Sequence, residues 1–138
     1  MTRRPALLLL PFLLVACAAT PSAAGWTHLG QRTVNPRVER DEIAVGAREG
    51  AFERIKLVVR GRAVTFRDVE VHYVNGARQD VALRSTIRAG GESRAVDLTG
   101  GDRRIARVTF VYDAVAVHDG GPRRGPGRPA VVSLYGER

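Results

Sequence analysis

Apolar and polar side chains alternate along almost the whole chain after residue 24, and no stretch repeats apolar residues at the spacing of a helix. Side chains of a strand point alternately to the two faces of its sheet, so this pattern predicts strands. They are Trp26–Val34, Glu42–Val45, Glu53–Arg60, Ala63–Val74, Gln79–Ile87, Arg94–Leu98, Ile105–Val117 and Ala130–Tyr135. About eight short strands separated by turn residues predict an all-β fold, a single antiparallel β-sandwich of jelly-roll type over residues 25–138.

The first 24 residues have a different character from the rest of the chain. Arg3 and Arg4 precede an apolar run, Ala6–Val15, that only Pro11 interrupts. A helix needs about 20 apolar residues to cross a bilayer, and this run is shorter. A cationic start followed by a short apolar run is typical of a secretion signal, so we expect residues 1–24 to direct export.

The only cysteine of the chain, Cys17, follows Leu14-Val15-Ala16 at the end of the apolar run. This order resembles the lipobox of bacterial lipoproteins and predicts cleavage before Cys17 and lipidation of its thiol. The protein would then lie in the periplasm or at the outer membrane. Alternatively, the small residues of Ser22-Ala23-Ala24 fit ordinary cleavage near residue 24, which predicts a secreted protein. The domain itself has no cysteine, so no disulfide stabilises it.

Two turns predict how the middle strands pair. Gly61-Arg62 fits a two-residue hairpin turn that pairs Val59 with Val64. After Phe66 the apolar phase slips by one residue, which predicts a β-bulge at residues 67–68.

The next turn contains Asn75-Gly76. A three-residue loop through Ala77 opposes the apolar residues Val71 and Val81, whereas a two-residue loop opposes Val71 to a charged residue. We therefore expect the longer loop.

Asp68, Glu70 and His72 alternate along one predicted strand and share a sheet face. Carboxylates and imidazole can bind a divalent metal or act as acid and base. In the predicted register, however, charged residues of the neighbouring strands face them, namely Arg54, Lys56, Asp80 and Arg84. This arrangement favours an ion-paired, solvated face, so we assign no catalytic residue, metal or cofactor.

Basic residues outnumber acidic ones by 22 to 14. With Arg3 and Arg4 in the leader, the domain keeps a net charge of +6, nearly all of it from arginine. Arg123, Arg124 and Arg128 lie in a loop rich in glycine and proline and are candidates for contact with an anionic envelope lipid or glycan. No aromatic residue interrupts this loop, whereas nucleic-acid-binding modules interleave stacking residues with basic ones, so nucleic acid is not expected.

The domain resembles a known family, the YaaI-like domain of unknown function found in small exported bacterial proteins. The resemblance covers most of the chain from residue 29 to residue 136, mainly at core and turn positions. Its features are Leu29-Gly30, Phe52-x-x-Ile55-x-Leu57, Val69-x-Val71-x-Tyr73, Ile87-x-x-Gly90-x-x-Ser93, Asp102-Arg103-Arg104-Ile105-x-x-Val108-x-Phe110 and Val132-x-Leu134-x-Gly136. The resemblance implies the fold and export, and it supplies no catalytic residue. Some members have cysteines in this domain, which the present chain lacks.

We therefore expect an exported envelope protein with a non-enzymatic binding or structural role, reaching the membrane only through an N-terminal lipid anchor. Two alternatives stay open. A metal-dependent hydrolase would need Asp68, Glu70 and His72 to converge in a pocket. A glycan-binding module would need an exposed aromatic platform, for which Trp26, Tyr112 and Tyr135 are available.

Overall fold

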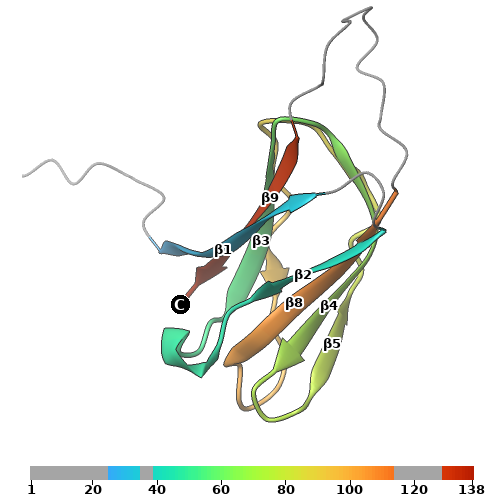
Figure 1. The fold of residues 1–138 in the computed structure, drawn as a ribbon. Helices are drawn as coiled ribbons and strands as arrows, with labels where there is room; N and C mark the ends of the chain where they lie inside the picture. Colours follow the sequence, from blue (N-terminus) through green and yellow to red (C-terminus); the bar gives the residue numbers. More distant parts are fainter. Residues whose placement is uncertain (1–24, 35–38, 114–128) are drawn as a thin grey trace, which may run out of the picture.

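The computed structural model describes residues 25–34, 39–113 and 129–138 and folds them into two packed antiparallel sheets (Figure 1). The strands are β1 (Trp26–Val34), β2 (Arg40–Ala44), β3 (Arg54–Arg60), β4 (Val64–Tyr73), β5 (Arg78–Val81), β6 (Thr86–Ile87), β7 (Val96–Asp97), β8 (Ile105–Tyr112) and β9 (Ala130–Glu137), with one turn of 3-10 helix, η1 (Ala47–Glu49), after β2. The predicted all-β sandwich is confirmed. Within these ranges no helix is long and apolar enough to cross a membrane.

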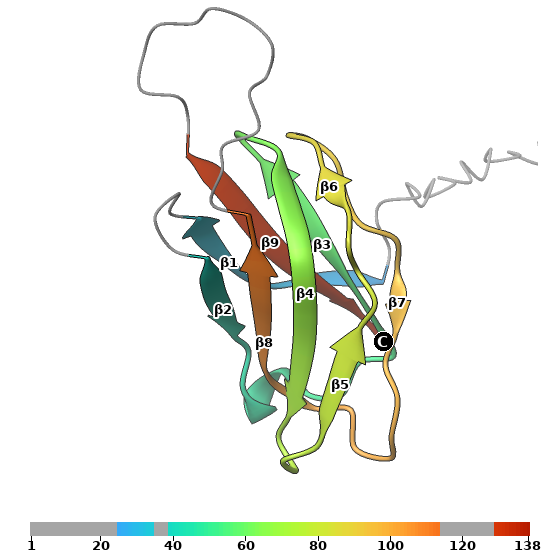
Figure 2. The same cartoon turned by 90° about the vertical axis from the view of Figure 1, so that its right-hand side faces the viewer.

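The strand order identifies the type of sandwich. One sheet has the order β1-β9-β3-β7 and the other the order β2-β8-β4-β5, with β6 beside β4 (Figure 2). Apart from the β4–β5 hairpin and β6, each strand lies in the opposite sheet from the strand before it. Two sheets connected in this way form a jelly roll, as the sequence predicts.

The core lies between the two sheets and is made by the side chains that the alternation places inward. Phe66 and Phe110 pack edge to face there, with ring centroids 5.9 Å apart. The largest fully buried side chains come from both sheets and are Phe52, Ile55, Leu57, Val59, Phe66, Val69, Val71, Ile105, Val108, Phe110, Tyr112 and Leu134.

The predicted hairpin at Gly61 is wrong. Val59 pairs with Val132 of β9 and Val64 pairs with Ile87 of β6, so β3 and β4 lie in different sheets. Gly61 has a φ of 81°, as a tight turn requires, but the turn carries the chain from one sheet to the other. A crossing between facing sheets keeps the same side chains inward as a hairpin does, so the apolar pattern fits both.

Two details of β4 are confirmed, and a third is corrected. The pairing of β4 with β8 shifts between Phe66 and Asp68, where the bulge was expected. The β4–β5 loop has three residues and Gly76 takes a φ of 89°, but the loop begins one residue earlier than predicted. Val71 consequently faces Gln79 rather than Val81. This shift of two residues leaves the inward set unchanged because side chains repeat every second residue.

Candidate anion-binding surface

Asp68, Glu70 and His72 lie on the outer face of the five-stranded sheet. Asp68 is exposed, whereas His72 is only 7% exposed. Arg107 of β8 and Arg78 of β5 flank His72 in the sheet.

Two of the charged neighbours predicted for this face, Arg54 and Lys56, do not lie on it, because β3 belongs to the other sheet. The register also places Asp80 opposite Glu70, not opposite His72, and leaves Arg84 beyond the end of β5. The predicted ion-paired face is confirmed only in part. Arg78 and Arg107 pair with Glu70 and Glu42 at 3.9 and 3.6 Å, whereas Asp68 lies beside the like-charged Asp80 and raises its pKa.

His72 is surrounded by charge. Its Nε2 lies 2.8 Å from Glu70 Oε1, an ion-pair distance, although the angle is unsuitable for a hydrogen bond. Its Nδ1 lies 3.4 Å from an Arg107 Nη2. Burial, followed by the Arg107 charge, lowers the pKa of His72, and the nearby Glu70 carboxylate opposes this only in part.

This cluster does not have the form of a metal or hydrolytic site. In the described ranges no group of three histidine, cysteine or acidic side chains is placed to hold a metal ion. Arginine side chains lie on two sides of His72, where they would repel a cation. The three residues line an open sheet face rather than converging in a pocket.

The lowered pKa of His72 predicts a loss of stability in acid. The folded state binds the His72 proton more weakly than the unfolded state, so stability is complete above pH 6.5 and falls as the pH drops through the lower folded-state pKa. We expect the free energy of unfolding in urea to decrease from pH 7 to pH 5, and to decrease less in His72→Gln. His28→Gln, at an exposed position of the other sheet, is the control. The same pH slope in all three proteins would contradict the assignment.

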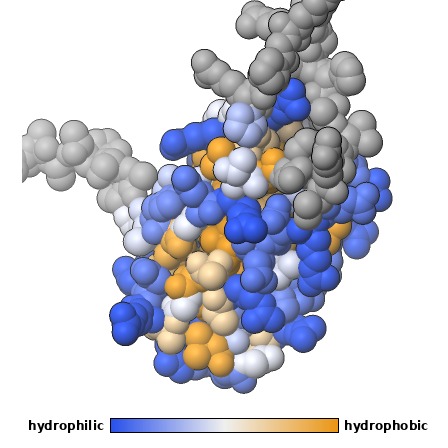
Figure 3. All heavy atoms as spheres, in the orientation of Figure 1, coloured by the Kyte–Doolittle hydropathy of each residue, from blue (hydrophilic) through white to orange (hydrophobic). Residues whose placement is uncertain are grey.

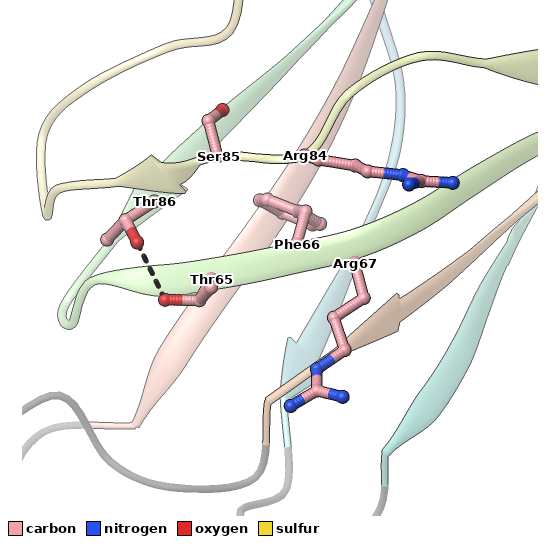
Figure 4. Close-up of a pocket in the computed structure, with 6 residues that line it drawn as sticks. All are labelled: Thr65, Phe66, Arg67, Arg84, Ser85 and Thr86. Atoms are coloured by element: carbon pink, nitrogen blue, oxygen red, sulfur yellow. Dashed lines mark hydrogen bonds between the residues drawn. The ribbon is translucent and has the colours of Figure 1, made fainter.

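Three arginines lie where the chain crosses from β3 to β4 and at the turn that follows β6. Val59 and the turn at Gly90-Gly91 exchange backbone hydrogen bonds of 2.8 and 3.0 Å, which place this turn against the end of β3. We call the resulting surface the arginine end. Its members are Arg60, Arg62 and Arg88; Arg62 is half-buried and the others are exposed. Arg84 is not one of them, because its side chain points away from the crossing (Figure 4) and its charge acts on Asp80. Among the described residues none of the three has a carboxylate within the 4.0 Å of an ion pair.

A shallow depression of about 490 Å³ lies beside the arginine end, lined by Thr65, Phe66, Arg67, Arg84, Ser85 and Thr86 (Figure 4). The hydroxyls of Thr65 and Thr86 hydrogen-bond to each other at 2.8 Å. Arg67 forms an ion pair with Asp113, and Figure 4 shows its guanidinium and that of Arg84 pointing apart. The arginines therefore present an open charged surface and do not converge on one small anion.

The surface as a whole is polar. Seen from the side of Figure 1, hydrophilic residues surround a narrow band of apolar ones (Figure 3). In the described part of the chain, Val74 is the one large hydrophobic residue that counts as exposed, at 37%. A partner of this surface would be recognised by charge and hydrogen bonds rather than by apolar contact.

Of the aromatic residues proposed for a glycan platform, Trp26 and Tyr135 lie on the outer face of the four-stranded sheet, and Tyr112 does not. Tyr112 is buried in the core. Trp26 packs under Lys56, whose Nζ lies 4.5 Å from the ring centre, and Tyr135 contacts the His28 ring at 5.2 Å. The platform therefore lacks Tyr112, and the remaining two rings are half-buried.

Cys17, Arg123, Arg124 and Arg128 lie outside the described residues, as does the whole predicted leader. Both residues that flank segment 114–128 nevertheless lie at the arginine end. Asp113 N donates to Thr65 O at 3.0 Å, and Pro129 O lies close against Gly61. The sequence could not reveal the arginine end, because residues 60–62 and 88 come together only through the jelly-roll topology.

A scan against protein-family models matches residues 7–121 to a domain of unknown function, DUF2541. No curated protein matches the chain. No solved structure matches it either. This result agrees with the expected family of unknown function, while the YaaI-like name and the bacterial host stay predictions. Because the match covers most of its length, the chain belongs to the DUF2541 family of domains of unknown function.

Proposed function

We propose that this protein is an exported, lipid-anchored, non-enzymatic module that binds an anionic component of the cell envelope through its arginine end. The observation that carries the proposal is that Arg60, Arg62 and Arg88 lie at one end of the domain without an ion pair in the described structure. Surface arginines without an acidic partner attract polyanions and form hydrogen bonds with phosphate, sulfate and carboxylate groups.

A further feature supports this proposal. Most other cations of the described surface already have an acidic partner, such as Arg32 with Asp41 at 3.1 Å and Lys56 with Glu92 at 3.2 Å. Arg123, Arg124 and Arg128, which lie outside the described residues, stay proposed contacts for the same anionic component. In this proposal the leader directs export and the lipidated Cys17 anchors the protein to the membrane.

Binding of a model polyanion tests this function. We expect the variant R60Q/R62Q/R88Q to bind fluorescent dextran sulfate about 100-fold more weakly at low salt, because each of the three arginines near an anionic surface contributes roughly 1 kcal/mol. The affinity is measured by fluorescence anisotropy over a range of salt concentrations, and binding should weaken as salt rises.

The matched control, R40Q/R48Q/R103Q, removes the same charge from exposed or half-buried positions elsewhere on the domain that likewise have no ion pair among the described residues. We expect it to change the affinity by less than threefold. An equal loss in both variants would mean that only the net charge matters, and the arginine end would then have no specific role.

A further inference from the structure

Strand β1 separates the start of the domain from the arginine end. Trp26, its first residue, pairs with Glu137 near the C-terminus, whereas Val34, its last, pairs with Ala130. Arg60 pairs with Val131 beside that same end of β9. A nine-residue strand is about 27 Å long at roughly 3.3 Å per residue. The arginine end therefore lies at the opposite end of the sandwich from Trp26 (Figure 1).

The proposed anchor is close to Trp26 along the chain. Nine residue steps separate Cys17 from Trp26. Fully extended, they span at most about 32 Å, and a flexible linker of this length has a root-mean-square span of about 17 Å. To bring the arginine end onto the anchoring bilayer, the domain would have to turn over and hold Trp26 about 27 Å above the surface. The linker would then be almost fully stretched, at a cost in conformational entropy.

The end near Trp26 carries paired charges. Arg54 forms an ion pair with Glu137, and Arg104 binds Asp102 through two nitrogen–oxygen contacts of 2.9 and 2.6 Å. The guanidinium of Arg104 holds the pKa of Asp102 well below its usual value, at about 2, so this carboxylate stays charged at neutral pH. Arg48, Arg103 and Arg138 at this end have no ion pair among the described residues, but the acidic residues Glu49, Glu53 and Glu137 lie among them. The described end next to the anchor therefore carries mixed charge, in contrast to the arginine end.

We infer that the arginine end faces away from the bilayer that holds the anchor and binds an anionic polymer beyond it, such as a sulfated, phosphorylated or carboxylated glycan chain. The inference rests on the proposed function. It assigns the anion to a polymer in the space outside the anchoring membrane rather than to the headgroups of that membrane.

The test attaches the protein to vesicles from either end. Cys17 is the only cysteine, so the chain from Cys17 onward can be coupled to a maleimide lipid at the site of the proposed anchor. A matched variant, Cys17→Ala with Ala89→Cys, is coupled through the exposed position beside Arg88 and so inverts the domain. Each form is placed on phosphatidylcholine vesicles with and without 30% phosphatidylglycerol, and the capture of fluorescent dextran sulfate is measured.

We expect the protein coupled at Cys17 to capture dextran sulfate within twofold of its affinity in solution on neutral vesicles. We expect the protein coupled at Ala89→Cys to lose at least tenfold. Phosphatidylglycerol should weaken the inverted form further and change the Cys17 form much less. Equal capture by both forms, or loss of capture by the Cys17 form on anionic vesicles, would overturn the inference, the latter in favour of contact with headgroups. If the free protein fails to bind dextran sulfate in solution, the proposed function itself is wrong.

Discussion

Replacing Gly61 with alanine is expected to destabilise the domain by about 3 kcal/mol, from left-handed backbone strain together with overpacking. Gly61 has a φ of 81°, which side chains with a Cβ rarely adopt. A Cβ at this position would lie 2.1 Å from Pro129 O, and a backbone oxygen at the start of β9 cannot rotate away as a side chain can. The crossing between the two sheets would have to shift instead.

Gly76→Ala separates the two causes. Gly76 also has a positive φ, 89°, but no atom lies within 4 Å of a Cβ built there. It should therefore lose only about 1 kcal/mol, from backbone strain alone. Urea unfolding followed by circular dichroism gives both values, and an equal loss in the two variants would show that the contact with Pro129 has no effect. Because Arg60 and Arg62 flank Gly61, we also expect Gly61→Ala to weaken polyanion binding.

The strands and their inward faces could be predicted from the sequence because both depend on local alternation. Ile55, Leu57 and Val59 are buried as expected, and the bulge after Phe66 lies where the apolar phase slips. Each of these features is determined by residues that lie only a few positions apart in the chain.

Which strands pair could not be predicted from the same pattern. β3 pairs with β9, more than 70 residues later in the chain, and nothing local at Gly61 separates a hairpin from a crossing. The error extends to the candidate site, since a hairpin at Gly61 would put Arg54 opposite Glu70 and Lys56 opposite Asp68. That the face is charged could be predicted because neighbouring strands offer charged residues on their solvated side, but the contact between the like charges of Asp68 and Asp80 could not.

The arginine end could not be predicted from the sequence either, because it depends on which segments meet in the fold. Its residues stand on both sides of Gly61 and on the segment around β6, and each alone is an ordinary surface arginine. Only the hydrogen bonds between Val59 and the Gly90-Gly91 turn bring the two segments together. The proposed function therefore depends on the fold, whereas the proposed location depends on the leader.

The proposed location at a membrane depends on Cys17. Replacing Cys17 with alanine is expected to abolish membrane anchoring completely in a bacterium that processes lipoproteins. Without the thiol no thioether to diacylglycerol can form, and two acyl chains hold a protein stably where one binds only reversibly. The mass of the wild-type protein extracted from membranes should correspond to a chain that begins at Cys17 and carries the lipid. Cys17→Ala should leave no protein of that mass in the membrane fraction.

Ala24→Gln is the matched control, because it disrupts the small residues of the alternative cleavage site and leaves Cys17 intact. If the leader is of the lipoprotein type, Ala24→Gln keeps the lipidated mass while Cys17→Ala loses it. If cleavage occurs near residue 24 instead, the pattern reverses: Ala24→Gln impairs processing and Cys17→Ala is released like the wild type. The two substitutions thus assign the leader in one experiment, and the second pattern would also remove the short linker on which the orientation of the arginine end depends.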